Sequence, residues 1–300
     1  MEELKVSVIV PNYNHAQYIE ERLQSILNQT YRNFEIIILD DKSTDESIGI
    51  INKYAVYPNV SHVVVNKENS GSPFKQWHKG FELAQGDLIW IAESDDTCDA
   101  SFLQLVVSSF EKDPKCVLSF CKSVRIDGEG KCRGWFAQQE GVNSFFMVNK
   151  EFMRKYLSKY NIVINASSAV FKKTALLNVD KAYMDYRGCG DWAFWAEVSK
   201  SGTVAYTDKE LNFYRVYGQN TTSTLAKKGV GVKEICKIYD YFFLKGYINR
   251  LVCFRRKLSL LLGVKYRSNF SKDEIREFET ECHYNFIYKT AAVILHSLGR

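Results

Sequence analysis

The fold is decided by the stretch KVSVIVPNYNHAQYIEERLQSILNQTYRNFEIIILDD, residues 5–41. It opens with a run of β-branched residues that stops at Pro11 and Asn12, which is typical of a strand. Residues 16–29 then carry apolar side chains at helical spacing, and residues 34–41 form a second, continuously apolar strand. A strand, a helix and a further apolar strand in this order predict a βαβ unit, whose parallel sheet is covered by helices on both faces.

The same alternation continues to about residue 110. We expect a helix over 44–55 with Thr44 as its cap, a strand and loop over 60–71, a helix over 75–86 closed by Gly86, and a fourth strand from Asp87. The fold class is therefore α/β, with a mostly parallel central sheet flanked by helices. Right-handed crossovers place the carboxyl ends of all these strands at one edge, where open α/β sheets bind ligands. Four polar loops follow these ends and should converge: 11–14, 40–45, 68–72 and 93–96.

The pattern is less regular from about residue 115 onward. We expect a strand over 116–127, a strand and helix over 167–176, a helix over 189–202, strands with a loop over 203–223, and basic helices from 225. The predicted organisation is a domain at 1–224, divided into a nucleotide-binding half at 1–110 and an acceptor half at 111–224, followed by a C-terminal helical region at 225–300.

Composition excludes several classes of protein. The net charge of +5, from 40 basic and 35 acidic residues, is too mild for a nucleic-acid partner but suits an anionic ligand. The eight cysteines form no CxxC pair and no secretory signal precedes them, which predicts reduced thiols, no zinc site and a cytoplasmic protein. The chain lacks GxGxxG after its first strand and GxxxxGK[ST] anywhere, which argues against dinucleotide and P-loop sites. No apolar run reaches the roughly 18 residues of a membrane-spanning helix.

An acidic cluster follows the fourth strand, where Glu93, Asp95 and Asp96 place three carboxylates within four positions. Two unit charges about 4 Å apart repel by roughly 4 kcal/mol at an effective dielectric near 20. A bound cation would offset this repulsion, and oxygen ligands suit Mg²⁺ or Mn²⁺. The alternative is a solvated turn that happens to be acidic.

Two longer segments carry a family resemblance. VSVIVPNYNHAQYIEERLQSILNQTYRNFEIIILDDKSTDES and the later GFELAQGDLIWIAESDD resemble inverting family 2 glycosyltransferases of the GT-A (Rossmann-like) fold. The resemblance is clear over residues 5 to about 110 and thinner to about 223. It implies metal-dependent transfer of a sugar from a nucleoside-diphosphate sugar, with UDP as the expected nucleotide. The implied acceptor is a hydroxyl of a glycan or lipid-linked saccharide, in bacterial surface-polysaccharide biosynthesis.

The resemblance also implies roles for residues in the first two loops. Pro11 and Tyr13 would line the nucleotide base, with the ring of Tyr13 stacking on it. Asp41 would accept a hydrogen bond from the base, while Asp40 would brace the loop. Lys75 stands where many relatives have an arginine; it would contact the nucleotide or its phosphates, or it is a solvated helix lysine.

The acidic cluster supplies the metal ligands on this resemblance. Asp96 would be the most direct ligand of Mg²⁺ or Mn²⁺, and Asp95 would lie near the ribose and help to hold the ion. Glu93 stands where the family often has aspartate, so its role is left open. Many relatives carry a histidine near Tyr217 for the metal or diphosphate, and this chain has none there. Either Arg215 contacts the diphosphate instead, or the metal has one fewer protein ligand.

The segment GCGDWAFW, residues 188–195, resembles the family's catalytic-base motif. It implies that Asp191 takes the proton of the acceptor hydroxyl as that oxygen attacks, so that one displacement inverts the anomeric centre. Asp191 is also a good helix N-cap, and both roles are compatible. Trp192 is expected either to form a platform for the acceptor sugar or to fill the core.

Three rival functions and one question of location remain open at this stage. A nucleotidyltransferase would release pyrophosphate, a non-catalytic carbohydrate-binding protein would need neither Asp96 nor Asp191, and a structural protein gives no reason for four converging polar loops. The basic and apolar segment FLKGYINRLVCFRRKLSLLLGVKYR, residues 243–267, could make peripheral contact with the inner face of the cell membrane or pack on its own domain.

Overall fold

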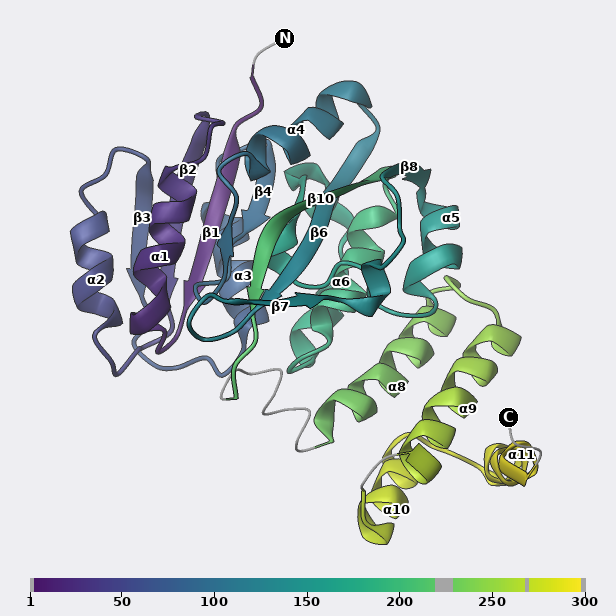
Figure 1. Cartoon of the computed structure of the whole chain (residues 1–300). Helices are drawn as coiled ribbons and strands as arrows, with labels where there is room; N and C mark the ends of the chain where they lie inside the picture. Colours follow the sequence, from purple (N-terminus) through teal and green to yellow (C-terminus); the bar gives the residue numbers. More distant parts are fainter. Residues whose placement is uncertain (1–2, 219–228, 268–269, 298–300) are drawn as a thin grey trace.

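The computed structural model describes residues 3–218, 229–267 and 270–297. One sheet of ten strands runs through it in the order β3-β2-β1-β4-β9-β6-β10-β5, with β7 beside β6 and β8 beside β10. Helices flank the sheet, and a group of C-terminal helices, green to yellow in Figure 1, extends to one side. The predicted α/β class with a C-terminal helical extension is confirmed.

The elements have the following bounds. The strands are β1 (Val6–Asn12), β2 (Phe34–Asp40), β3 (Val60–Val65), β4 (Leu88–Ile91), β5 (Thr97–Cys98), β6 (Cys116–Ile126), β7 (Cys132–Trp135), β8 (Phe145–Val148), β9 (Ala169–Lys172) and β10 (Thr203–Arg215). The α-helices are α1 (Ala16–Leu27), α2 (Ser47–Tyr54), α3 (Pro73–Leu83), α4 (Phe102–Lys112), α5 (Asn149–Phe152), α6 (Gly190–Ser199), α8 (Val230–Leu244), α9 (Arg250–Arg267), α10 (Lys272–Glu281) and α11 (Phe286–Ser297).

The first four long strands are parallel, as their continuous apolar character predicts. β1 lies between β2 and β4, with Val8 opposite Ile36 on one side and Trp90 on the other. Alternate β1 residues face opposite layers. Val8 belongs to a core with α1, α2 and α4, whereas Ile9 belongs to a core with α3 and α6. Each fully buried aliphatic side chain of this kind contributes about 1.5–3 kcal/mol.

Two predicted helix ends differ from those observed. α2 begins at Ser47, and its first turn is held by Asp45, whose carboxylate accepts from the Ser47 amide at 3.0 Å, so Thr44 is not the cap. α3 ends at Leu83, before Gly86. A Cβ at Gly86 would lie 2.6 Å from the Lys5 carbonyl oxygen, so this glycine allows close approach to the chain entering β1.

The second half of the sheet is mixed. β9 runs antiparallel to both β4 and β6, and β6 runs parallel to β10. β10 is one long strand with register shifts between Thr207 and Asn212, where the sequence predicted strands with a loop. Positions 219–223 of that prediction lie outside the described residues, as does the predicted domain boundary at 224 and 225, which remains a prediction.

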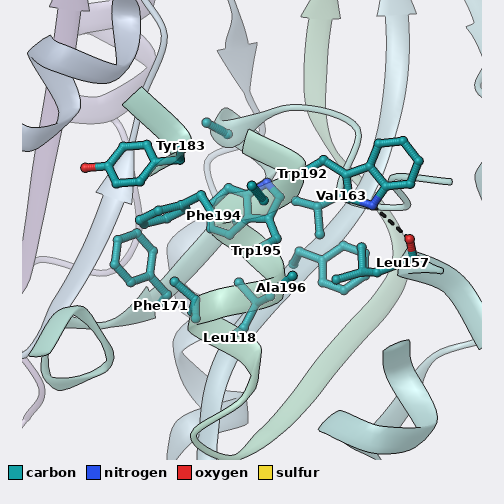
Figure 2. Close-up of a cluster of buried hydrophobic side chains, with 14 of the residues drawn as sticks. Leu118, Leu157, Val163, Phe171, Tyr183, Trp192, Phe194, Trp195 and Ala196 are labelled. Atoms are coloured by element: carbon teal, nitrogen blue, oxygen red, sulfur yellow. Dashed lines mark hydrogen bonds between the residues drawn. The ribbon is translucent and has the colours of Figure 1, made fainter. Parts of the chain in front are cut away.

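The core under α6 holds most of the large aromatic side chains of this half. Phe194 and Trp195 are fully buried, with Phe171 of β9 and Tyr183 close by (Figure 2). α8 joins the same core through Tyr239 and Phe242. A second cluster, with members Cys236, Leu258, Phe278 and Ala292, joins α8 to α9, α10 and α11. Within the described ranges, no helix has the length and apolar character needed to cross a membrane.

Candidate functional site

Hydrogen bonds join the polar loops at the carboxyl edge of the parallel strands. The first loop is bonded to the second and to the fourth, the second to the third, and the helix after the third to the fourth. The pairs are Asn12 Nδ2 to Asp40 at 2.8 Å, the Ser70 amide to Asp41 Oδ1 at 2.9 Å, Trp77 Nε1 to Glu93 at 2.8 Å, and His15 Nδ1, directly after the first loop, with the Ser94 hydroxyl at 2.8 Å. The predicted convergence of the four loops is therefore observed.

The two aspartates after β2 hold different loops. Asp40 is fully buried and accepts from Asn12 and from both the amide and the hydroxyl of Ser43, which is a bracing role. The Oδ1 of Asp41 accepts from Asn66, from the Ser70 amide and from Gln76, so it orders the loop before α3. Its Oδ2 accepts from the Ser70 hydroxyl at 2.8 Å. Asp41 is 5% exposed, and its Oδ2 retains acceptor capacity for a second donor.

The predicted nucleotide-contacting side chains are placed unequally. Pro11 is buried inside β1 and shapes the backbone. Tyr13 is 45% exposed, so its ring is available for stacking. Lys75 is exposed on the first turn of α3, with its Nζ 3.4 Å from the Ser70 carbonyl oxygen.

The acidic tip consists of Glu93, Asp95 and Asp96. Asp96 is 1% exposed and accepts from Asn165 Nδ2 and from the Arg215 amide at 3.0 Å. Asp95 is half-buried and accepts from the Tyr217 hydroxyl at 3.3 Å. Asp95 is therefore the more accessible of the two predicted metal ligands.

Burial dominates the ionisation of this tip. It raises the pKa of Glu93 to about 8, with the charge of Asp95 adding to the effect, while the bond from Trp77 opposes it. Burial also raises the pKa of Asp96 to about 7, reinforced by Asp95 and opposed by the guanidinium of Arg22. Carboxyl groups held in this way gain from a nearby cation, which favours their ionised form.

The tip fits a lightly ligated divalent cation. Its donors are carboxylate oxygens, which Mg²⁺ and Mn²⁺ prefer. Across the part of the chain that the structure describes, no group of three or more His, Cys, Asp or Glu residues is arranged to hold a metal. Mg²⁺ commonly binds through one or two carboxylates together with substrate phosphates and water. The half-buried Asp95 offers such a carboxylate, whereas both oxygens of the buried Asp96 already accept protein hydrogen bonds.

Arg215 does not have the predicted diphosphate-facing position. It is 1% exposed, its Nε donates to the Asp95 carbonyl at 2.8 Å, and its Nη2 pairs with Glu21 at 2.6 Å. Its Nη1 donates to the carbonyls of Asp127 and Gly128 at 3.0 and 3.2 Å. The guanidinium is committed to these protein groups, so Arg215 braces the end of β4 against α1 and the turn after β6.

A histidine that the sequence analysis did not single out lies beside the tip. His15, directly after the PNYN loop, places Nε2 3.1 Å from the Tyr217 hydroxyl and Nδ1 2.8 Å from the Ser94 hydroxyl. Burial lowers its pKa, against the opposing charges of Asp96 and Asp45. The family resemblance predicts a histidine near Tyr217, and the sequence has none there. In the structure, the imidazole of His15 lies beside Tyr217 instead. In the sequence, the one signal for His15 is its position directly after Asn14 of the first polar loop.

Arg22 is a second residue that sequence reasoning missed. Its side chain is fully buried in α1, with the guanidinium carbon 4.8 Å from the centroid of the Trp90 ring in β4. Its three nitrogens have no hydrogen-bond partner among the described residues. In the sequence it is one charge on an amphipathic helix, and only the packing of α1 on β4 places it behind the acidic tip.

Asp191 lies in the first turn of α6. Its carboxylate accepts from the Trp192 amide and from Asn161 Nδ2, both at 2.8 Å. The N-cap position belongs to Cys189, so Asp191 is inside the helix and is not its cap. Burial raises the pKa of Asp191 to about 7, the range suited to a general base.

Contacts before and after Asp191 fix its place. A Cβ at Gly190 would lie 2.7 Å from the Phe74 ring, so α6 begins directly against the first turn of α3. Helix α3 also carries Trp77, which donates to Glu93. Trp192 is 5% exposed, and its Nε1 donates to the Leu157 carbonyl at 3.0 Å (Figure 2). Of the two alternatives for Trp192, the structure supports core packing and not a sugar platform.

Comparison with other sequences adds independent evidence. The model of the family described as "Glycosyl transferase family 2" matches residues 7–176. "Glycosyltransferase GlyG" of Streptococcus pneumoniae is 37% identical over 283 residues, covering 93% of this chain and 79% of the relative. "Poly(ribitol-phosphate) beta-glucosyltransferase" of Bacillus spizizenii is 29% identical over 281 residues, covering 87% of this chain and 42% of the relative. The chain thus spans less than half the length of that second relative.

Solved structures share the architecture. S. aureus TarS 1-349 in complex with UDP-GlcNAc matches with a TM-score of 0.60 at 17% identity, covering 94% of this chain and 73% of that chain. The mannosyltransferase PcManGT from Pyrobaculum calidifontis, in complex with GDP-Man and Mn2+, matches with a TM-score of 0.58 at 15% identity, covering 98% of this chain and 84% of that chain. These identities are low, so the structures speak for the fold. The family match over residues 7–176, the 37% identity along most of the chain and the common GT-A fold establish that this chain is a glycosyltransferase of family 2.

Proposed function

We propose that this glycosyltransferase uses a nucleoside-diphosphate sugar, with UDP as the nucleotide, and transfers the sugar with inversion to a hydroxyl of a glycan or lipid-linked saccharide. The observation that carries the proposal is the pairing of an acidic tip at the end of β4 with a half-buried carboxyl, Asp191, at the start of α6. The second group reaches the same region because α6 begins against α3, whose Trp77 contacts the tip.

The donor side of the site is the first two loops. Tyr13 has an exposed ring that can stack on the base, and the Oδ2 of Asp41 can accept a base N–H. Lys75 is exposed in the first turn of α3, after the loop that Asp41 orders, and its ammonium group can contact a phosphate as a point charge. The complexes of TarS with UDP-GlcNAc and of PcManGT with GDP-Man support a nucleotide sugar as the donor.

Asp95 and Asp96 would hold Mg²⁺ or Mn²⁺, with Asp95 offering the accessible oxygen. When bound, the ion supplies positive charge that stabilises the departing diphosphate. Asn165 and the Arg215 amide hold the carboxylate of Asp96, and the Tyr217 hydroxyl donates to the carboxylate of Asp95, so each carboxylate has a protein donor that orients it.

Asp191 takes the proton from the acceptor hydroxyl. Its two hydrogen bonds fix the carboxylate in one rotamer, and its pKa of about 7 leaves a substantial ionised fraction at neutral pH. The hydroxyl oxygen becomes nucleophilic as the proton leaves and attacks the anomeric carbon from the face opposite the diphosphate. The Bacillus spizizenii relative is a poly(ribitol-phosphate) beta-glucosyltransferase, which supports a polymer as the acceptor.

A donor screen with variants tests the proposal. Purified protein is incubated with UDP-sugars and candidate saccharide acceptors, with and without Mn²⁺, and UDP, pyrophosphate and product are measured. We expect UDP release that requires Mn²⁺, total loss of transfer in Asp191→Asn with UDP binding retained, and loss of Mn²⁺-dependent turnover in the Asp95→Asn, Asp96→Asn double variant. Pyrophosphate release would favour the nucleotidyltransferase rival, and near-normal turnover in both variants would refute the site.

Peripheral membrane contact through the C-terminal helices remains a prediction. The features that support it are the exposed Leu251 near basic Arg250 and Arg255 on α9, and the exposed Phe286 and Ile287 on α11. Salt-sensitive co-flotation with anionic liposomes is the expected result, and absence of co-flotation at low salt would count against it.

A further inference from the structure

The loop that leads into Asp191 is held by a carboxylate from the C-terminal helices. Glu234 of α8 accepts from three consecutive backbone amides: Arg187 at 2.6 Å, Gly188 at 2.9 Å and Cys189 at 2.8 Å. Glu234 is 6% exposed. Three amides that point at one buried anion form a nest, and hydrogen bonds to a charged acceptor are the stronger kind.

These bonds fix the chain immediately before the proposed base. Asp191 comes two residues after Cys189, and Gly190 between them packs against the Phe74 ring of α3. The loop is therefore held on one side by α3 and on the other by Glu234. Any backbone shift at 187–189 would carry the carboxylate of Asp191 with it, because the first turn of α6 continues directly from this loop.

α8 is itself attached to the catalytic domain, so Glu234 has a defined position. Tyr241 of α8 and Tyr247 just beyond it both donate to the buried Glu197 of α6 at 2.7 Å. Tyr239 donates to the Lys159 carbonyl at 3.0 Å, and its ring lies 5.7 Å from that of Trp192. The polar and aromatic contacts of α8 thus reach both ends of α6, Trp192 in its first turn and Glu197 near its last.

We propose that Glu234 is a positioning residue for catalysis, which holds the 187–189 amides so that Asp191 is presented to the acceptor hydroxyl. The C-terminal helical region is then part of the active centre and not an appended module. This inference rests on the proposed role of Asp191 as the base.

The variant Glu234→Gln distinguishes a positioning role of Glu234 in catalysis from a purely structural role. Glutamine keeps the size of the side chain but replaces one acceptor oxygen with an NH₂ group, which opposes the amides that the oxygen accepted from. Lys233→Gln is the matched control, because Lys233 is the neighbouring residue of α8 and pairs with Glu277 and Glu281 of α10, away from the loop. Asp191→Asn is measured in parallel.

The full-length protein is assayed with UDP-sugar and Mn²⁺ for kcat and for the KM of the donor, and UDP binding is measured by calorimetry. For Glu234→Gln we expect kcat to fall by about 10- to 100-fold with the donor KM and UDP affinity unchanged, since a misplaced catalytic group costs rate without costing nucleotide binding. Hydrogen exchange should show lost protection at the 187–189 amides, and Lys233→Gln should behave as the wild type in every measurement.

The pH profile gives a further readout. The titratable groups around Asp191 are Glu234 from α8 and the Cys189 thiol from its own loop, whose pKa is raised by burial, and Asn161 is its neutral partner. Removing the Glu234 charge should move the acid limb of kcat to lower pH, which general destabilisation would not do.

Each outcome decides. An unchanged kcat with intact protection at 187–189 overturns the proposal, as does an equal loss of kcat in Lys233→Gln. If Glu234→Gln fails to bind UDP, Glu234→Asp replaces it; the shorter carboxylate should restore folding with kcat still reduced, and wild-type kcat in Glu234→Asp would again overturn the positioning role. An active Asp191→Asn would instead refute the proposed function, whatever Glu234→Gln does.

Discussion

The two halves of the catalytic sheet build their parts of the site in different ways. In residues 6–91 the strands β1 to β4 run parallel to one another, and the functional side chains lie in short loops directly after them, as Asp41 and Asp95 do. In residues 116–217 the strands pair mostly antiparallel, and β7, β8 and β9 have four residues each. There, a residue such as Asn165 gains its role from a contact with Asp96, 69 positions away. The candidate site residues of the first half therefore follow local sequence motifs, whereas those of the second half depend on long-range contacts.

The halves meet at the acidic tip. Asn165 donates to the carboxylate of Asp96, and the Ser167 hydroxyl accepts from the Glu93 amide at 3.1 Å. β9, which follows these residues, pairs with β4, which precedes the tip. The second half therefore orients carboxylates that the first half supplies, so the comparison can be tested from either side.

The largest expected effect is on kcat, to which the second half of the sheet would contribute the base. If the second half supplies the base, kcat should depend on the ionisation of Asp191 while the donor KM does not. Its raised pKa of about 7 means that the carboxyl is protonated, and inactive as a base, below that pH. We expect kcat to fall roughly tenfold per pH unit below about 7, to about 1% of its plateau near pH 5. Steady-state kinetics from pH 5 to 9 check this, and an acid limb near pH 4 would contradict it.

The next effect concerns the tie between the halves. Arg215→Met should lower the free energy of unfolding by about 3 kcal/mol, because it leaves the carbonyls of Asp95 and Asp127 without their buried donor. Urea unfolding measures the loss. Glu21→Gln is the control: it removes the charge of the pair at a side chain that is 51% exposed, so it should cost less than about 1 kcal/mol. Equal losses in both variants would show that the ion pair, and not the bracing of β4, is what matters.

These contacts show how far sequence reasoning reaches. Periodicity and strand-end position predicted β1 to β4, the convergence of the loops and the acidic tip, because those features depend on neighbouring residues. The sequence left open whether Arg215 contacts the diphosphate, because its neighbours in sequence do not reveal its burial against Tyr18 and Glu21. The bond from Glu234 to the 187–189 amides has no local signal at all, since it requires the packing of α8 on α6.

A smaller effect tests the cost of the acidic tip in the first half. The pKa of Glu93 is raised from 4.5 to about 8, so the folded protein holds its proton more tightly than the unfolded chain does. Its contribution to stability is complete below about pH 4.5 and is lost as the pH rises through about 8. In metal-free buffer, Glu93→Gln should remove this decline, so its stability relative to the wild type should increase between pH 6 and pH 9. Thermal unfolding at pH 6 and 9 tests it, with the exposed Glu68→Gln as a control that should follow the wild type.

The smallest effect is expected for two side chains that donate hydrogen bonds to the acidic tip, one from each half of the sheet. Tyr217→Phe removes a hydroxyl that is 3.3 Å from Asp95 and 3.1 Å from His15, so it should raise the donor KM by less than about tenfold, in keeping with the modest net value of one hydrogen bond. Trp77→Phe removes a 2.8 Å bond to Glu93 and also empties space in a core where Trp77 is 2% exposed. It should therefore lower stability as well as raise KM. Tyr217→Phe should lose less stability than Trp77→Phe. An equal loss would mean that the second half stabilises the tip as much as the first half does. The first half could then no longer be described as building the tip while the second only orients it.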